Sequence, residues 1–264
     1  MLRIWGRGNS NNVKKVLWCA EEIGLAYEHI PAGGAFGVVD SPEYRALNPN
    51  GLVPTIEDDG LVLWESNAIV RYLAARYSDG VLYEDDPARR ALADRWMDWA
   101  TASFARHFID VFWNIVRTAP EKRNMQAVET GIQQCVRALA IPEAALERHP
   151  FLSGERLGMG DIPLGTFIHA WLTMPIERPE MPAVAAWYDR LKARPAYPKA
   201  VAIPLTGNRR PFSPAAEPGR RCDFPDDRIA RKPLRENDFA EHAPGRRRRH
   251  PPRRRQAILS AVPR

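Results

Sequence analysis

Cysteine is scarce in this sequence of 264 residues, and its placement excludes several classes of protein. Three cysteines lie far apart and are odd in number: Cys19, Cys135 and Cys222. This pattern argues against a disulfide framework, a zinc site and a Cys-x-x-Cys redox motif. No stretch approaches 18 consecutive apolar residues, and no apolar leader follows Met1. We therefore expect a cytoplasmic protein that binds no metal and does not associate with a membrane.

Charge is distributed unevenly along the chain. The net charge is +6, but residues 207–264 alone hold sixteen Lys and Arg against seven Asp and Glu. Of the 38 basic and 32 acidic residues, 22 and 25 lie before residue 207, so that part is mildly acidic. Residues 207–264 also contain nine prolines and no sustained periodicity, which is typical of a disordered tail. A functional tail would attach to nucleic acid or to an acidic membrane surface. The alternative, which we favour, is an extension without function from an altered reading frame.

The first eighty residues alternate between strand and helix patterns. Short apolar runs and turn signals predict strands over residues 2–5, 27–30, 55–57 and 61–64. Apolar spacing and capping residues predict helices over residues 12–23, from Pro42 and from Ser66. This order of elements is typical of a thioredoxin-like domain, which we place at residues 1–80.

Residues 87–206 show helical patterns only, so we predict an all-helical second domain. The expected helices cover a long aromatic-rich stretch from Pro87, residues 126–146, residues 161–172, residues 182–193 and residues 195–203. Pro142 should kink or break the second of these. Most aromatic residues here are expected in the core, but Arg106, Phe108 and Trp113 are candidates for a cleft.

A polar turn, Ser10-Asn11-Asn12, lies between the first predicted strand and the first predicted helix. A thiolate at such a helix N-terminus is favoured by the helix dipole and by nearby hydrogen-bond donors. A thiol has a pKa of about 8.5, and lowering it by two units needs about 2.7 kcal/mol. Ser10 and Asn12 are therefore candidates for activating a thiol, and a plain helix cap is the alternative.

Two dipeptides flank a predicted hairpin whose turn contains Asp59-Gly60. Val53-Pro54 precedes the hairpin, and a proline between apolar residues at a strand entrance is a candidate for a cis bond. Glu65-Ser66 follows the hairpin, with Ser66 expected as the helix cap. Free backbone N–H groups at a helix start bind a carboxylate, and Glu65 can pair with an amine. The pair therefore suits the end of an amino acid.

These motifs resemble the glutathione S-transferase family, in particular its bacterial, theta/beta-like serine-type subgroup. The resemblance is carried by residues 10–16 (Ser-Asn-Asn-Val-Lys-Lys-Val), by Val53-Pro54 and by Glu65-Ser66, and it covers residues 1–206 but not the tail. It implies an α/β plus all-α fold, with a thioredoxin-like glutathione-binding domain followed by a helical bundle over residues 87–206. It also implies a homodimer.

The resemblance assigns roles to individual residues. Ser10, assisted by Asn12, would hold the glutathione sulfur, and the backbone of Val53, before a cis-Pro54, would pair with the cysteinyl part. Glu65 and Ser66 would hold the γ-glutamyl end.

Further candidates are less specific. Asn50 is either a glutathione contact or a turn residue. Lys14 and Lys15 either balance the glycyl carboxylate or lie in solvent. Arg106, Phe108 and Trp113 would line the pocket for the electrophile.

The implied function is a detoxifying glutathione transferase that conjugates its co-substrate glutathione to a small electrophile. One alternative is a glutathione-dependent disulfide reductase or peroxidase. Another is a non-catalytic binding protein of the same fold, with nucleic acid a partner only if the tail is functional. The sequence departs from the family at Gly158. Three residues before the buried Asp161, the family usually has a Ser or Thr that caps the helix. Because Gly is the poorer cap, we expect Gly158→Ser to raise the melting temperature.

Overall fold

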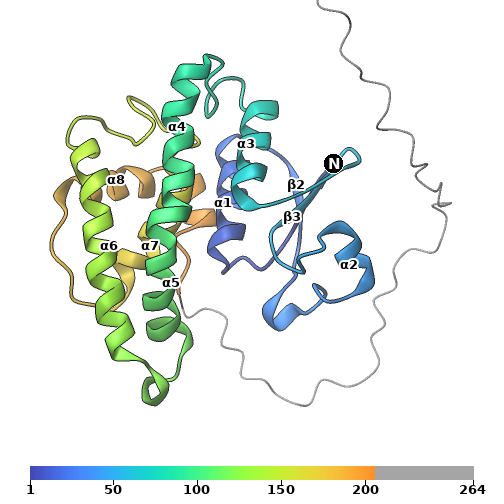
Figure 1. The fold of residues 1–264 in the computed structure, drawn as a ribbon. Coiled ribbons are helices and arrows are strands. Elements are labelled where there is room, and N and C mark those ends of the chain that lie inside the picture. The colour runs from blue at the N-terminus through green and yellow to red at the C-terminus, as the bar shows by residue number, and fades with distance from the viewer. Residues whose placement is uncertain (206–264) are drawn as a thin grey trace, which may run out of the picture. The chain divides into compact units, whose positions relative to one another are not determined.

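The computed structural model describes residues 1–205. The predicted disordered tail, residues 207–264, lies outside the described residues. Figure 1 shows a small sheet with helices beside it, followed along the chain by a group of longer helices.

Four strands form one mixed sheet in the order β2-β1-β3-β4 (Figure 1). β1 (Leu2–Trp5) runs parallel to β2 (Tyr27–Ile30) and antiparallel to β3 (Thr55–Asp58). β3 also pairs with β4 (Leu61–Trp64), with Thr55 opposite Trp64. Asp59 and Gly60 both have positive φ, 48° and 89°, as a two-residue hairpin turn of the primed type requires. The predicted strands are thus confirmed, with β3 one residue longer.

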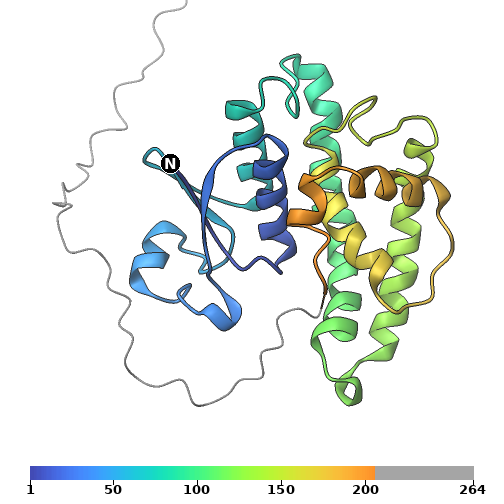
Figure 2. The same cartoon turned by 180° about the vertical axis from the view of Figure 1, so that it is seen from behind.

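Helices cover the sheet. The parallel β1–β2 pair needs a crossover, and α1 (Asn11–Glu22) supplies it. α1 packs against α3 (Ser66–Tyr77), and both views place α1 between the sheet and the C-terminal helices (Figures 1 and 2). The short α2 (Pro42–Leu47) begins at Ser41, whose side chain accepts a hydrogen bond from Tyr44 N.

The C-terminal part begins with a helical stretch that runs without interruption from residue 87 to residue 117. It consists of α4 (Pro87–Trp99), the π-helical segment η2 (Ala100–Ala105), α5 (Arg106–Phe112) and the π-helical segment η3 (Trp113–Arg117). The π-helical segments were not foreseen from the sequence. Such segments are rare and occur often at functional sites.

The remaining helices complete a bundle around a buried one. They are α6 (Met125–Leu146), α7 (Asp161–Thr173), α8 (Pro182–Lys192) and α9 (Ala196–Ala200), and the short 3₁₀ turns η1 (Gly34–Phe36) and η4 (Pro120–Lys122) lie in loops. α7 is buried from Asp161 to Trp171 and so forms the centre of the bundle. The predicted combination of a thioredoxin-like sheet domain and a helical bundle is confirmed.

Two local expectations need correction. Pro142 does not break α6, which continues to Leu146, and the alternative of a kink stays a prediction. Tertiary contacts hold this turn, because the adjacent Glu143 carboxylate accepts hydrogen bonds from Ala183 N and Val184 N at the start of α8. Ser66 is not the cap of α3 but its first residue, and the N-cap is Glu65 with φ 73°.

Gly158 is required by close packing. A Cβ at this position would lie 2.7 Å from both Cβ and Oγ of Ser153, so a serine side chain does not fit without a shift. The Asp161 carboxylate already has four hydrogen-bond donors without a serine at position 158. They are the backbone N–H groups of Leu152, Ser153 and Gly158 and Nε1 of Trp187. This packing argues against the expectation that Gly158→Ser stabilises the fold.

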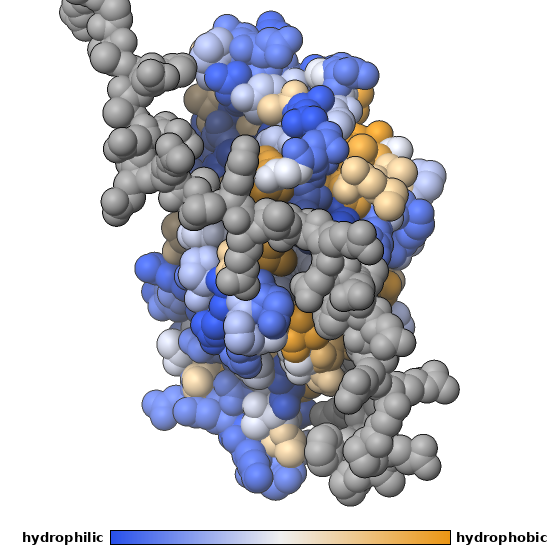
Figure 3. All heavy atoms as spheres, turned by 90° about the vertical axis from the view of Figure 1, so that its right-hand side faces the viewer, coloured by the Kyte–Doolittle hydropathy of each residue, from blue (hydrophilic) through white to orange (hydrophobic). Residues whose placement is uncertain are grey.

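The surface shown in Figure 3 is mostly hydrophilic, with apolar residues gathered in separate patches. Exposed apolar residues of the sheet domain include Leu52, Leu61, Val62 and Trp64. Within residues 1–205, no helix has the length and apolar character needed to span a membrane.

Candidate functional site

A cavity of about 340 Å³ opens at the N-terminus of α1. One wall is the turn between β1 and α1, and the other is the helical stretch from η2 to η3. The lining residues are Arg7, Asn9, Ser10, Asn11, Asn12, Lys15, Thr101, Ala105, Arg106, Phe108, Ile109, Phe112, Trp113, Arg117 and Phe167. The cavity therefore joins the polar turn singled out in the sequence to the aromatic stripe of the helical part.

Ser10 is the N-cap of α1, with extended backbone angles (φ −84°, ψ 126°). Its side chain makes no capping hydrogen bond, unlike Ser41 at the start of α2. The backbone N–H of Ser10 donates to Arg7 O, and Ser10 O accepts from Lys14 N, so the turn is fixed by its main chain. The Ser10 hydroxyl thus lines the cavity and is not used to cap α1.

Asn12 connects this turn to α3. Its Oδ1 accepts a hydrogen bond from Ser66 Oγ at 3.4 Å. Ser66 itself is buried and lies 3.4 Å from Lys15 Nζ. The structure therefore brings three predicted residues together: Ser10, Asn12 and Ser66.

Val53 and Pro54 lie where the chain enters β3, and the bond between them is cis, as predicted. Val53, Pro54 and Glu65 do not line the cavity. Val53 lies beside Gly33, where an added Cβ would be 3.4 Å from Val53 Cγ1 and 3.2 Å from Nη1 of Arg7, which does line it. Glu65 directly precedes α3 and makes no side-chain cap. The first N–H groups of α3 are thus left without a capping side chain.

Asn50 is not joined to the cavity. Its backbone N and its Nδ2 both donate to Asn48 Oδ1, and Asn48 in turn is buried and donates to Leu52 O and Thr55 Oγ1. These bonds build the turn before the cis-proline. Of the two readings of Asn50, the geometry favours the turn residue.

All three residues predicted for the electrophile pocket line the cavity: Arg106, Phe108 and Trp113. Phe108 is fully buried and stacks between Phe104 and Phe112, with ring centroids 5.6 and 5.5 Å away. Phe108 therefore supplies an apolar floor, whereas Trp113 is more than half exposed and stands at the rim.

The two lysines of α1 do not lie in solvent, so the second of the two alternatives given for them is wrong. Lys14 and Lys15 are 2% and 1% exposed. Lys14 Nζ donates to Val201 O at 3.0 Å, which directs it to the segment after α9 and away from the cavity. Burial, together with the charge of Arg117, lowers the pKa of Lys14 to about 8. Sequence periodicity could not show that the C-terminal segment covers this face of α1.

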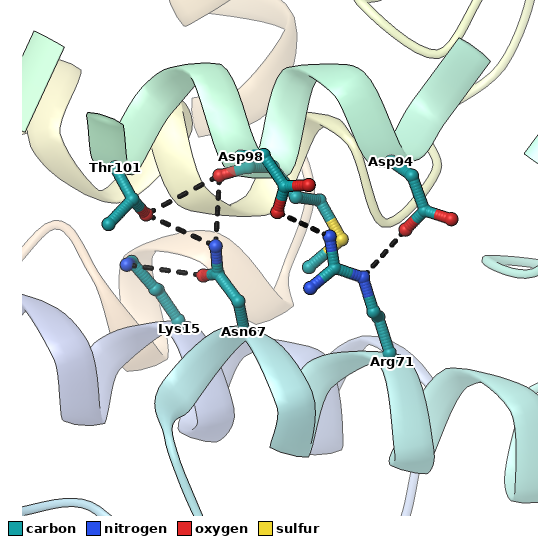
Figure 4. Close-up of polar contacts among 7 residues, drawn as sticks. Lys15, Asn67, Arg71, Asp94, Asp98 and Thr101 are labelled. Atoms are coloured by element: carbon teal, nitrogen blue, oxygen red, sulfur yellow. Dashed lines mark hydrogen bonds and ion pairs between the residues drawn. The ribbon is translucent and has the colours of Figure 1, made fainter. Parts of the chain in front are cut away.

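Lys15 is the inner link of a polar network between α1, α3 and α4 (Figure 4). Its Nζ lies 3.3 Å from Asn67 Oδ1, and Asn67 Nδ2 donates to Met97 O and Thr101 Oγ1. One turn further along α3, Arg71 pairs with both Asp94 and Asp98 at 2.6 Å. Burial lowers the pKa of Lys15 to about 8, and Glu65 opposes that shift.

Several cavity residues were missed in the sequence. They are Arg7, Asn9, Thr101, Phe112 and Arg117. Phe112 belongs to the aromatic stripe, so the sequence offered a reason to consider it, whereas an isolated arginine or threonine has no recognisable sequence pattern. These residues line the cavity only because the η2–η3 stretch packs beside the β1–α1 turn. Within residues 1–205 no group of three or more His, Cys, Asp or Glu is placed to hold a metal ion.

The geometry defines a class of protein before any comparison is made. A thioredoxin-like sheet, a cis-proline turn, and a serine without a capping partner beside a helical bundle are features of a thiol-binding transferase. Family models agree: "Glutathione S-transferase, N-terminal domain" matches residues 6–80, and "Glutathione S-transferase, C-terminal domain" matches residues 125–190.

Individual relatives agree as well. Glutathione S-transferase GstB of Escherichia coli is 43% identical over 208 residues, covering 78% of this chain and 100% of the relative. Glutathione S-transferase 3 of Zea mays is 33% identical over 219 residues, covering 77% and 95%. The theta class glutathione S-transferase of Xanthomonas axonopodis pv. citri, crystallised with glutathione bound, is 58% identical with a TM-score of 0.76, covering 78% and 99%. The chain belongs to the glutathione S-transferase family, which confirms the predicted fold, enzyme class and transferase function.

Proposed function

We propose that Ser10 holds the sulfur of glutathione as a thiolate and that the protein transfers it to a small electrophile. The observation that carries this proposal is the Ser10 hydroxyl, which lines the cavity at the start of α1 without making a cap. Its O–H can donate to a thiolate, and the α1 dipole favours negative charge there. Asn12 lies in the first turn of the same helix, and its Oδ1 accepts a hydrogen bond from Ser66 Oγ of α3.

The rest of glutathione would lie along the loop before β3 and the start of α3. The backbone of Val53 would pair with the cysteinyl part, next to Pro54. Glu65 would take the γ-glutamyl amine, and Ser66 with the uncapped N–H groups of α3 would take the carboxylate. The Xanthomonas relative, crystallised with glutathione bound, supports glutathione as the co-substrate.

The electrophile would enter from the side of the cavity formed by Arg106, Phe108 and Trp113. The sulfur lone pair forms a bond to an electrophilic carbon, and the leaving group departs with its electron pair. The protein contributes thiolate formation and orientation, and no metal takes part in this scheme.

The test uses the full-length protein and the Ser10→Ala variant. Glutathione binding is followed by calorimetry, thiolate formation by ultraviolet difference absorbance, and turnover with an activated aryl chloride. We expect Ser10→Ala to bind glutathione within severalfold of the wild type but to lose at least tenfold in kcat and to require higher pH for thiolate formation. Ser103→Ala, a serine of η2 that does not line the cavity, serves as the control. Equal turnover in Ser10→Ala would remove Ser10 from the mechanism.

The same samples separate the alternative functions. Disulfide reduction without turnover of electrophiles would favour the glutathione-dependent reductase or peroxidase. Binding with neither reaction would favour a binding protein. The homodimer and the detoxifying role stay predictions from the family resemblance. The cytoplasmic location and the domain boundary near residues 80–87 stay predictions from the sequence pattern. Light scattering coupled to size-exclusion chromatography tests the homodimer.

A further inference from the structure

The charge of the cavity is one-sided. Among the described residues that line it, four are cationic, namely Arg7, Lys15, Arg106 and Arg117, and none is acidic. Within residues 1–205 no ion pair engages any of these four. Arg7 and Arg117 are half-buried, and half-buried cations without an ion-pair partner are unfavourable, so a bound anion would be attracted to them.

Arg7 and Arg117 approach the cavity from its two walls. Arg7 follows β1 and packs against the turn at Gly33 and Gly34, where added Cβ atoms would lie 3.2 and 3.3 Å from its side chain. Arg117 ends η3, with its guanidinium 5.4 Å from the Phe112 ring centroid and its Nη2 3.5 Å from Asn9 O.

The positive charge of Arg7 acts on Arg117. Burial lowers the pKa of Arg7. Burial also lowers the pKa of Arg117, and Arg7 lowers it further. Arg117 in addition lowers the pKa of Lys14. Geometry brings the two groups to one place, because Arg117 Nη2 lies 3.5 Å from Asn9 O, two residues after Arg7, and both arginines line the same cavity. An anion bound between Arg7 and Arg117 would relieve their repulsion and accept charge-assisted hydrogen bonds from both.

The neighbours of Arg117 indicate what such an anion is attached to. Phe108, Phe112 and Phe167 line the same cavity, with the Phe108 and Phe167 centroids 5.3 Å apart, and Trp113 stands at the rim. A free inorganic anion would gain nothing from these rings. An apolar or aromatic molecule with one anionic end would use both the rings and the arginines.

We propose that the electrophile accepted by this enzyme has an apolar or aromatic body and one anionic group, a carboxylate or sulfonate, which Arg7 and Arg117 bind together. This inference rests on the proposed function of the same site. The competing occupant of the two arginines is the glycyl carboxylate of glutathione, and the kinetic parameters distinguish the two.

The test compares two benzylic chlorides of equal shape: para-(chloromethyl)benzoate, which is anionic, and para-(chloromethyl)benzamide, which is neutral. In both reactions the glutathione thiolate forms a sulfur–carbon bond and chloride leaves with the electron pair. Each kcat/KM is divided by the rate of the uncatalysed reaction, so that intrinsic reactivity cancels. We expect the full-length enzyme to prefer the benzoate by at least tenfold.

Variants then locate the preference. Arg7→Gln and Arg117→Gln should each reduce the benzoate-to-amide ratio several-fold, mainly through KM for the benzoate, and Arg117→Lys should restore part of it. Because the readout is a ratio, a general change in thiolate formation cancels. Arg137→Gln, which removes an exposed charge from α6 away from the cavity, should leave the ratio unchanged.

The outcomes are separable. A ratio near one in the wild type, with clear turnover of the amide, would overturn the anion inference and leave the transferase standing. A rise in KM for glutathione, with an unchanged ratio in Arg7→Gln and Arg117→Gln, would assign the arginines to glutathione and also overturn it. Binding of glutathione without turnover of either chloride would instead contradict the proposed function.

Discussion

Lys15 Nζ lies 3.3 Å from Asn67 Oδ1, so a buried ammonium on α1 donates a hydrogen bond to an amide on α3. No carboxylate among the described residues is in hydrogen-bond contact with this ammonium. Its remaining contacts are Ser66 Oγ at 3.4 Å and the ring of Phe167, whose centroid is 5.0 Å away. Neutral oxygens and a ring compensate a buried charge only in part, which explains why burial lowers the pKa of Lys15 to about 8.

Replacing Lys15 should therefore stabilise the protein while removing a cavity cation. In the unfolded chain Lys15 has its ordinary pKa near 10.4, so between about pH 8 and pH 10 only the unfolded state keeps the proton. Stability attributable to this residue thus rises with pH in that window and is lowest below it. We expect Lys15→Met to raise the free energy of unfolding at pH 7 by about 1–3 kcal/mol.

Urea unfolding at pH 7 and at pH 9.5 checks this prediction. The advantage of Lys15→Met should shrink at the higher pH, and the exposed Lys122→Met should show no comparable change. A Lys15→Met variant that is less stable than the wild type at both pH values would mean that the lysine contacts outweigh its desolvation.

Asn67 should behave in the opposite way. Its Nδ2 donates to Met97 O and Thr101 Oγ1, and its Oδ1 accepts from Lys15 (Figure 4). Asn67→Leu keeps the volume but removes these bonds and leaves the buried Lys15 ammonium with one polar partner fewer, so we expect a loss of about 1–3 kcal/mol in unfolding free energy. Gln133→Leu, on the exposed face of α6, is the matched control. Chemical denaturation measures both, and equal stability of the two variants would contradict the role given to this network.

Gly158→Ser should lower the melting temperature, because its Cβ would overlap with Ser153 Cβ and Oγ at 2.7 Å. The double variant Ser153→Gly, Gly158→Ser removes the overlapping atoms and should recover part of the loss. Calorimetry of the two single variants and the double variant measures this coupling. Additive effects of the two substitutions would show that contact with Ser153 is not the cause.

Cys19 and Cys135 should resist alkylation in the native protein. Burial raises the pKa of each thiol to about 12, so very little thiolate exists at neutral pH. In a Cys222→Ser background, mass spectrometry after iodoacetamide treatment should find both residues unmodified at pH 8 and both modified in urea. Rapid labelling of either cysteine in the native protein, with loss of activity, would contradict this prediction and indicate that the cysteine takes part in function.

The local part of the fold could be predicted from the sequence. Asp59-Gly60, Ser41-Pro42 and Val53-Pro54 act through their own backbone preferences, and each lies where the pattern placed it. The cap at Glu65 could not be predicted, since its φ of 73° is unusual for a non-glycine residue and is imposed by the surrounding chain.

Residues of both cavity walls were predicted, the polar turn on one side and Arg106, Phe108 and Trp113 on the other, but not the contacts that join the two walls. Ser10 and Asn12 belong to one turn, whereas Arg117 reaches Asn9 across 108 positions. The burial of Lys14 likewise depends on Val201, far along the chain. Such contacts arise from packing between domains, which composition and periodicity do not encode. The aromatic stripe predicted a helix, but not the π-helical segments that set which of its residues face the cavity.

The uninterrupted helical stretch from α4 to η3 has a consequence for how this enzyme could diverge. Within this stretch, Thr101 accepts a hydrogen bond from Asn67 of α3. Arg117, sixteen positions later at the end of η3, lines the cavity. Insertion or loss of one residue in a π-helical segment rotates everything beyond it relative to everything before it. New substrate preferences could therefore evolve by single-residue insertions or deletions in η2, while the sheet and the thiol-binding turn keep their sequence.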